Sequence, residues 1–175
     1  MTITRKRSRV ELQNPAPEPH DELHSVLDYA LAYAAAGFAV FPCEFGGKAP
    51  LTNRGFKDAN DSISQIYRWF VSATPCNIAI ATGDVSNLVV LDFDPRNGAD
   101  CNKFLTDNAR YFAGVKYGRV LTGGGGTHLF FRKATPLFRP PAELFGPGVD
   151  VKCDGGYVIA PPSIHPSGGQ YVWCA

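Results

Sequence analysis

The chain has 175 residues, of which 45% are hydrophobic and 19% charged, and its formal net charge at pH 7 is +1. That length and apolar content suit one packed domain or two small lobes. Because the net charge is close to zero, the composition excludes a uniformly basic nucleic-acid binder, and any surface for a polyanion has to be a local patch.

Residues 1–20 are predicted to form a disordered arm. The arm is basic from Arg5 to Arg9 and carries Pro15, Pro17 and Pro19. Polar residues and prolines follow the basic run, unlike in a signal peptide, and no stretch approaches the ~18 consecutive apolar residues of a membrane-spanning helix. We therefore expect a cytoplasmic protein that is neither secreted nor anchored in a membrane.

Residues 21–175 are expected to form one domain that mixes helices and strands. Apolar residues at helical spacing run from Leu23 to Ala34, and Gly37 stands where a C-terminal cap belongs. Ser62 and Gln65 match a capping box that opens a second helix. The other predicted elements are a helix at 97–108 and strands at 38–42, 77–80, 88–93, 119–122, 127–132, 149–152, 157–159 and 170–173. The predicted fold class is therefore α/β in the mixed, α+β sense.

The strand predicted at 88–93 is the most informative element, because its pattern ends in two carboxylates one residue apart. On a strand, this spacing places Asp92 and Asp94 on the same face, with Cβ atoms about 7 Å apart. Rotamer choice can then bring both carboxylates onto a pair of divalent cations roughly 4 Å apart. Phosphoryl and nucleotidyl transfer use such a pair.

Two alternatives to a two-metal site stay open for these acids. Asp94 also begins a turn sequence that ends at Gly98, and acids at strand ends often hydrogen-bond turn amides. Phosphotransferases of the haloacid-dehalogenase type also open with a hydrophobic strand and Asp-x-Asp, although Arg96 stands where Thr or Val is expected in them. An EF-hand loop is excluded, because Asn97 replaces its glycine and Lys103 its final glutamate.

Two later strands are joined through Thr122 and four consecutive glycines, Gly123, Gly124, Gly125 and Gly126. Free N–H groups in such a loop can curl around an anion, and the missing side chains let a ligand approach. The loop matches neither a Walker A motif nor a dinucleotide fingerprint, and a flexible hairpin tip explains it equally well. Just after it, His128 can donate to a phosphate oxygen, and Arg132 lies four residues further on the same face.

Asp150 interrupts an apolar alternation in the strand predicted at 149–152. A buried carboxylate at such a position needs a cation or several hydrogen-bond donors. The neighbouring Asp154, by contrast, is explained by a hairpin turn with Gly155 and Gly156. Three acids and a phosphate-cradling loop together describe a two-metal site.

The five cysteines are scattered and include no Cys-x-x-Cys pair. Free thiols in a reducing compartment are therefore expected. Lone cysteines are most often buried small hydrophobes, so no zinc site is predicted.

Several segments in a fixed order make the chain resemble the bifunctional DNA primase/polymerase (prim-pol) family of the archaeo-eukaryotic primase superfamily. They are GFAVFP at 37–42, KAP at 48–50, GFKDA at 55–59, VLDFD at 90–94, TGGGGTH at 122–128, and GVD at 148–150 through PPS at 161–163. Any one of these segments alone is weak evidence for the family. The ordered set is specific, and it extends from about residue 30 to residue 173.

The resemblance implies an α/β N-terminal module packed on a sheet like that of an RNA-recognition motif, with the active site in the cleft between them. It also implies that Asp92, Asp94 and Asp150 bind two Mg²⁺ or Mn²⁺ ions, and that His128 faces the phosphates of the incoming nucleotide. Further nucleotide or template contacts are implied for the loop glycines, Thr122, Arg132, Lys48, Ser163 and Lys152. Relatives commonly carry Arg where this chain has Lys152. Lysine keeps the positive charge but cannot make the two parallel hydrogen bonds of a guanidinium group.

The sequence therefore predicts a template-dependent nucleotidyltransferase, a DNA primase and DNA polymerase acting in phage or plasmid replication. Expected partners are single-stranded DNA template, primer, NTPs and dNTPs, with a C-terminal helicase or accessory module in a longer polypeptide. Two alternatives stay open. One is a non-catalytic DNA-binding or origin-recognition module, and the other is a dehalogenase-type phosphotransferase that forms phospho-aspartate on Asp92.

Overall fold

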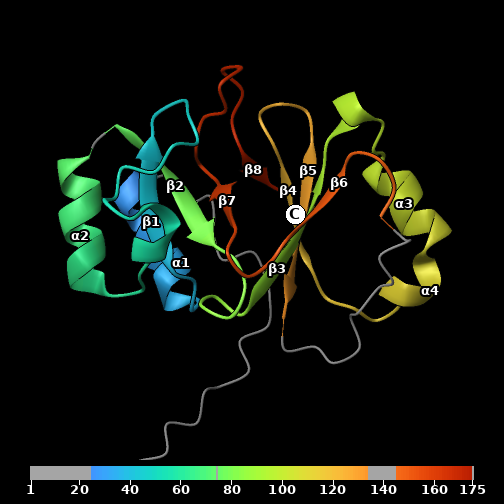
Figure 1. The fold of residues 1–175 in the computed structure, drawn as a ribbon, viewed down its shortest axis with the longest axis horizontal. Helices are drawn as coiled ribbons and strands as arrows, with labels where there is room; N and C mark the ends of the chain where they lie inside the picture. The colour runs from blue at the N-terminus through green and yellow to red at the C-terminus, as the bar shows by residue number, and fades with distance from the viewer. Residues whose placement is uncertain (1–24, 74, 134–144, 175) are drawn as a thin grey trace, which may run out of the picture.

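Two antiparallel β-sheets face each other between two pairs of helices in the computed structural model (Figure 1), which describes residues 25–73, 75–133 and 145–174. The smaller sheet has the order β1-β2-β7, built from β1 (Val40–Glu44), β2 (Cys76–Ala81) and β7 (Tyr157–Ala160). The larger sheet has the order β6-β3-β5-β4-β8, built from β6 (Val149–Lys152), β3 (Leu88–Phe93), β5 (Thr127–Arg132), β4 (Gly118–Leu121) and β8 (Val172–Trp173). The arm predicted for residues 1–20 lies outside the described residues.

The first two helices, α1 (Val26–Ala35) and α2 (Ile63–Ser72), pack beside the smaller sheet. Helix α1 begins at Val26 because Ser25 caps it, in a capping box with Asp28. The capping box predicted for α2 is wrong. Ser62 does precede that helix, but its side chain makes no cap hydrogen bond, and its hydroxyl contacts Ser64 Oγ at 3.1 Å instead.

Two short helices and a 3₁₀ turn replace the single helix predicted at 97–108. The turn is η2 (Pro95–Asn97), and the helices are α3 (Cys101–Asp107) and α4 (Ala109–Phe112). Gly98 ends η2 at φ +89°, a left-handed conformation that suits glycine, and Asp100 then caps α3 by accepting the Lys103 N–H at 2.9 Å. A second 3₁₀ turn, η1 (Gly55–Asp58), lies between β1 and α2.

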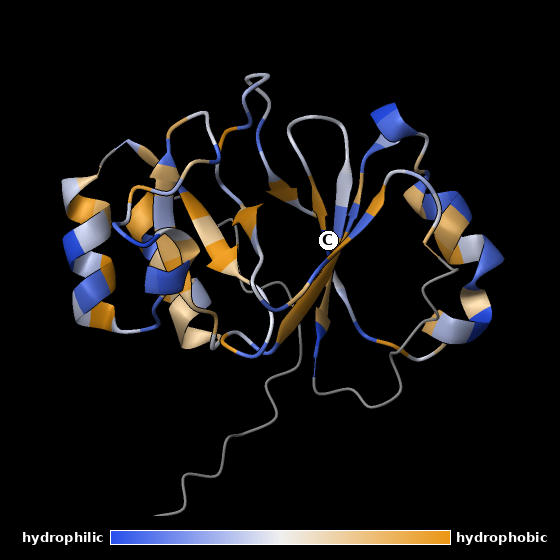
Figure 2. Cartoon of the chain, in the orientation of Figure 1, coloured by the Kyte–Doolittle hydropathy of each residue, from blue (hydrophilic) through white to orange (hydrophobic). Residues whose placement is uncertain are grey.

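The larger sheet separates two hydrophobic cores. On β3, Leu88 and Val90 join the core that also contains the smaller sheet, α1 and α2, whereas Leu91 and Phe93 join the core beneath α3 and α4. Figure 2 shows the facing strands as mainly hydrophobic and the helices as hydrophilic over much of their surface. Since side chains alternate along a strand, Asp92 lies on the Val90 face, toward the smaller sheet. The fold thus places this carboxylate at the rim of the core between the two sheets.

Candidate active site

Strand pairing brings two carboxylates and an imidazole side by side. Asp92 on β3 lies directly opposite His128 on β5 and opposite Asp150 on β6. Directly opposed residues in antiparallel strands share a face and have Cβ atoms about 5 Å apart. His128 Nε2 is 3.3 Å from Asp92 Oδ1. The register of three strands therefore builds the centre of the site.

Asp92 stays ionised although it is largely enclosed. Burial alone would raise its pKa, but the hydrogen bond and charge of His128, helped by Lys152 and Lys48, outweigh burial and lower the pKa below its ordinary value. His128 itself is only 5% exposed, and its Nδ1 has no hydrogen-bond partner within the described part of the chain. With Nε2 facing Asp92 and Nδ1 buried, this imidazole presents neither nitrogen freely to a ligand.

Asp94 follows β3 and is held by the turn after it. Its carboxylate accepts hydrogen bonds from Arg96 Nε (3.0 Å) and from the second Arg96 amino group (2.9 Å). It also accepts the Arg96 backbone N–H (3.0 Å) and Asn97 Nδ2 (3.1 Å). The Arg96 hydrogen bonds are the main reason that the pKa of Asp94 is lowered. Asp94 therefore makes the hydrogen bonds to the turn that its position in the sequence suggested.

Asp150 is not buried, contrary to the expectation from its strand pattern. Its side chain is 75% exposed and pairs with Lys152 Nζ at 3.1 Å. The physical reason is that β6 is an edge strand of the larger sheet, so its side chains are open to solvent. Asp150 still shares the face of Asp92.

The glycine loop makes room for a second segment of the chain. A Cβ on Gly123 would overlap the Gly169 carbonyl, and one on Gly124 would lie 2.9 Å from His165 Cε1. A Cβ on Gly126 would in turn lie only 2.6 Å from the Phe93 carbonyl oxygen. These glycines therefore permit contacts within the protein, where the sequence suggested the approach of a ligand.

Two of the loop N–H groups are also used internally. Gly126 N–H donates to Thr122 Oγ1 and Gly125 N–H to the Thr122 carbonyl, both at 2.9 Å. For the N–H groups of Gly123 and Gly124, the described residues supply no partner. Only the first half of the loop therefore offers free donors of the kind expected from the sequence.

One histidine of the site was not singled out from the sequence. His165 lies in a tight hairpin closed by the bridge between Ile164 and Gln170, and its backbone N–H donates to the Gly169 carbonyl at 2.7 Å. Its ring lies 5.9 Å from the ring of Tyr171, which is in turn 6.1 Å from the ring of His128. No local signal marked His165, because its proline and glycine neighbours indicate only a turn and the glycine loop that it packs against is distant in the sequence.

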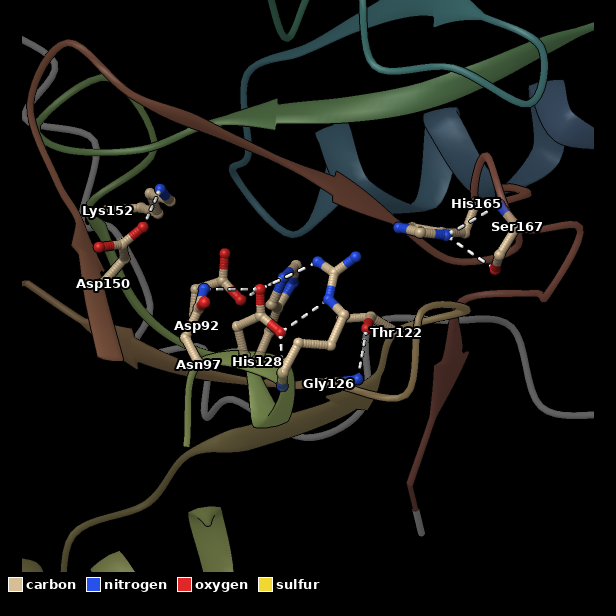
Figure 3. Close-up of polar contacts among 11 residues, drawn as sticks. Asp92, Asn97, Thr122, Gly126, His128, Asp150, Lys152, His165 and Ser167 are labelled. Atoms are coloured by element: carbon tan, nitrogen blue, oxygen red, sulfur yellow. Dashed lines mark hydrogen bonds and ion pairs between the residues drawn. The ribbon is translucent and has the colours of Figure 1, made fainter. Parts of the chain in front are cut away.

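These groups line one cavity of about 390 Å³. Its charged members are three acids and three bases: Asp92, Asp94, Asp150, Lys48, Arg96 and Lys152. Thr122, Gly124, Gly126, His128, His165 and Tyr171 also contribute to the wall. Figure 3 shows Asp150 and Lys152 at one end of the site and His165 with Ser167 at the other. The formal charges of these acids and bases therefore balance within the cavity.

Comparison with protein families identifies the chain. The family model described as bifunctional DNA primase/polymerase, N-terminal, matches residues 30–175. The chain belongs to this prim-pol family. Membership implies a nucleotidyltransferase, and the mixed fold with antiparallel sheets is consistent with it. A search of curated proteins found no match.

Two of the residues expected to contact the nucleotide or template, Arg132 from its strand face and Ser163 from the resemblance, lie away from the cavity of this prim-pol domain. Arg132 pairs with Leu88 at the far end of β5, its guanidinium donates to the Ala36 carbonyl at 3.0 Å, and it lies over the Phe38 ring. Ser163 is buried, and its hydroxyl accepts the Ile78 N–H at 2.8 Å. Both side chains thus hold the fold together, whereas Lys48 and Lys152 do line the cavity.

A second cavity, of about 320 Å³, adjoins the first in the prim-pol domain and shares Asp92, His128 and Tyr171 with it. Its distinctive members are Phe56 and Tyr157, whose rings stack with centroids 6.2 Å apart. The space next to the acids is therefore aromatic on one side and polar on the other.

Carboxylates of the right kind for Mg²⁺ or Mn²⁺ are present, but they are paired with cations in this structure. No group of three His, Cys, Asp or Glu side chains lies close enough to hold a metal ion in the described ranges. Arg96 holds Asp94, Lys152 holds Asp150, and only Asp92 faces the cavity without a Lys or Arg partner. The donors are of the type that binds a hard divalent cation, and the strand register places Asp92 beside Asp150, but the three acids are not gathered around one point in the described structure.

The described helices include none that is long and apolar enough to cross a membrane. The five cysteines are all free thiols, as their spacing suggested.

Proposed function

We propose that this chain is a template-dependent nucleotidyltransferase that adds NTPs or dNTPs to a 3′-hydroxyl on single-stranded DNA, as a primase and polymerase in DNA replication. The observation that carries the proposal is the strand register that sets Asp150, Asp92 and His128 side by side in one cavity, with Asp94 at the end of the same strand. In this proposal the larger sheet is the module like an RNA-recognition motif, and the cavity between the sheets is the active site.

Asp92, Asp94 and Asp150 would hold two Mg²⁺ or Mn²⁺ ions, which supply Lewis-acid chemistry to the 3′-hydroxyl, the α-phosphate and the leaving pyrophosphate. Asp92 is suited to this role because His128 keeps it ionised. Arg96 and Lys152 neutralise the other two acids in the structure, and they become available to substrate phosphates when those acids bind cations instead.

The remaining groups of the cavity bind and orient the nucleotide. Lys48, Arg96 and Lys152 supply positive charge, and the N–H group of Gly124 can donate to a phosphate oxygen. His128 holds the Asp92 carboxylate and, when Asp92 binds a cation, has Nε2 for a phosphate oxygen. The Phe56 and Tyr157 rings offer a surface on which a base can stack.

Template-directed synthesis on single-stranded DNA tests this function. We would measure it with Mg²⁺ and with Mn²⁺, with and without a primer, for the parent and for an Asp92→Ala, Asp94→Ala double variant. Asp58→Ala is the matched control, because Asp58 also pairs with a neighbouring arginine but lies outside the cavity. We expect synthesis by the parent and the control alone.

Two other outcomes would overturn the proposal. Equal synthesis by the double variant would remove the acids from the mechanism. A folded parent that binds DNA yet synthesises nothing would favour the DNA-binding module instead.

A further inference from the structure

The ring of His165 is fixed in one orientation by its own hairpin. Ser167 N–H lies 3.1 Å from Nδ1, and the Ser167 hydroxyl lies 2.9 Å from the same nitrogen. The same hydroxyl oxygen lies 2.8 Å from the Gly123 carbonyl oxygen, and its single proton is donated to that carbonyl or to Nδ1 but not to both; in either case the hairpin contacts the glycine loop. The imidazole, the hairpin and the first half of the loop therefore form one unit, in which Nδ1 faces inward.

This arrangement leaves Nε2 on the cavity side. A backbone N–H can only donate, so the contact with Ser167 makes Nδ1 the acceptor in the neutral ring and assigns the proton to Nε2. Nε2 has no hydrogen-bond partner within the described residues, and Figure 3 shows that side of the ring directed toward the middle of the site. The other cavity histidine, His128, has Nε2 against Asp92 instead.

The surroundings of Nε2 favour an anion. Burial is the main cause that lowers the pKa of His165, and the positive charges of Lys48 and Arg96 add to it, so the ring lies in a positive potential. The ring packs against Gly124, whose N–H is also without a partner in the described chain. Asp150 lies at the opposite end of the site (Figure 3). A neutral N–H donor and a free backbone N–H thus lie together at one end of the cavity, where the charges of Lys48 and Arg96 are felt.

We propose that this end is the subsite for the distal phosphates of the nucleoside triphosphate, with His165 donating from Nε2 to a β- or γ-phosphate oxygen. The proposal rests on the proposed function, because it assumes that a triphosphate occupies the cavity. It also gives the nucleotide a direction, with the α-phosphate at Asp92 and the distal phosphates at the glycine loop. Ser167 is then a positioning residue that holds the ring and the loop together.

Equilibrium binding by titration calorimetry tests the subsite without requiring catalysis. The probes are dATP, dADP, dAMP and pyrophosphate, each with Mg²⁺ and without template. Two variants each keep a polar group at the position of only one of the two ring nitrogens. In His165→Gln the amide reaches the position of Nε2, whereas in His165→Asn the amide replaces Nδ1 and keeps the contact with Ser167.

We expect His165→Asn to lose about tenfold or more in affinity for dATP and pyrophosphate, because a hydrogen bond to a charged group is lost. Affinity for dAMP should stay unchanged, and His165→Gln should recover most of the loss. If Asn binds dATP as the parent does, or Asn and Gln weaken it equally with a lower thermal midpoint, the role of His165 is structural and the proposal is overturned.

The failure of this subsite can be told from the failure of the proposed function. A parent that binds dATP and synthesises DNA, with variants that do the same, overturns the subsite alone. If the parent binds dATP through His165 but does not synthesise DNA, the subsite stands and the polymerase function falls. A parent that binds no nucleotide overturns both.

Discussion

The two ends of the cavity are built in different ways. At one end, Asp150, Asp92 and His128 are neighbours because three strands pair in one register. At the other end, the glycine loop and the 164–170 hairpin meet through contacts between segments, such as that of Ser167 with Gly123. A sheet fixes its side chains through many backbone hydrogen bonds, whereas the loop end depends on a few contacts and on the absence of Cβ atoms. We therefore expect changes at the strand end to affect chemistry, and changes at the loop end to affect binding and stability.

The largest expected effect comes from Asp92→Asn. This nearly isosteric change removes the carboxylate charge at the centre of the strand end, and we expect the rate of synthesis to fall by about a thousandfold or more. Single-turnover kinetics on a primed template measure the loss, with Asp58→Asn as the control for an acid outside the cavity. A decrease below tenfold, with unchanged thermal unfolding, would contradict the central place of Asp92.

His128→Ala should raise the nucleotide KM more than it weakens DNA binding, by about ten- to a hundredfold. The same change should raise the pKa of Asp92, because His128 is what outweighs burial there. A carboxyl whose pKa is lowered by folding stabilises the folded state at pH values above its ordinary pKa, and this stabilisation is lost as the pH falls through the lowered pKa. Because His128→Ala reduces the lowering, the free energy of unfolding of the variant should be smaller than that of the parent near neutral pH. Carbon-detected NMR titration of the metal-free protein would show the direction, and an effect on DNA affinity alone would refute the role.

Gly123→Ala tests the loop end. Its new Cβ would overlap the Gly169 carbonyl, and we expect a loss of about 1–3 kcal/mol in the free energy of unfolding, with weaker dATP binding. Urea denaturation measures the first effect. Gly146→Ala is the control, because a Cβ there meets nothing within 4 Å. Equal stability of the two variants would mean that loop and hairpin can separate freely.

The smallest effect is expected for Arg96→Ala, which removes the partner of Asp94 in the cavity wall. Removing the guanidinium frees the Asp94 carboxylate, so Mn²⁺ should bind about two- to threefold more tightly, because an exposed ion pair contributes little. Paramagnetic resonance of free Mn²⁺ follows this binding directly. Weaker Mn²⁺ binding would show that Arg96 holds Asp94 in the conformation that metal requires.

Local sequence patterns predicted the strands that carry the site. The strands predicted at 88–93, 127–132 and 149–152 have those bounds in the structure, because alternation and flanking turns are local signals. The first strand was predicted two residues too early, and the predicted helix at 97–108 is interrupted, since Gly98 and Asp100 end one turn and begin the next. The acids, His128, Lys48 and Lys152 all line one cavity, and their assignment to metal and nucleotide stays a prediction.

The errors arise where a side chain's partner is distant in the sequence. Arg132 and Ser163 were assigned to the nucleotide or template, but their partners are the Ala36 carbonyl just after α1 and the Ile78 amide of β2, which no local pattern reveals. Asp150 was expected to be buried, and only the sheet order shows that its strand is at an edge. His165 was missed because its role depends on the glycine loop, whose Gly123 lies 44 residues before Ser167 in the chain.

The sequence by itself determined the chemistry available to this prim-pol domain: a pair of acids at the end of a strand, a third acid, a glycine loop followed by histidine, and the family to which the chain belongs. Tertiary structure alone decided which of these groups face one another. Residue types and short periodicities can be read from neighbouring positions in the sequence. Strand register, edge position and ion pairing depend instead on contacts that form only when distant segments pack together. His128 and His165 show the difference, since both histidines adjoin the same glycine loop, yet only packing leaves Nε2 of His165 open to the cavity.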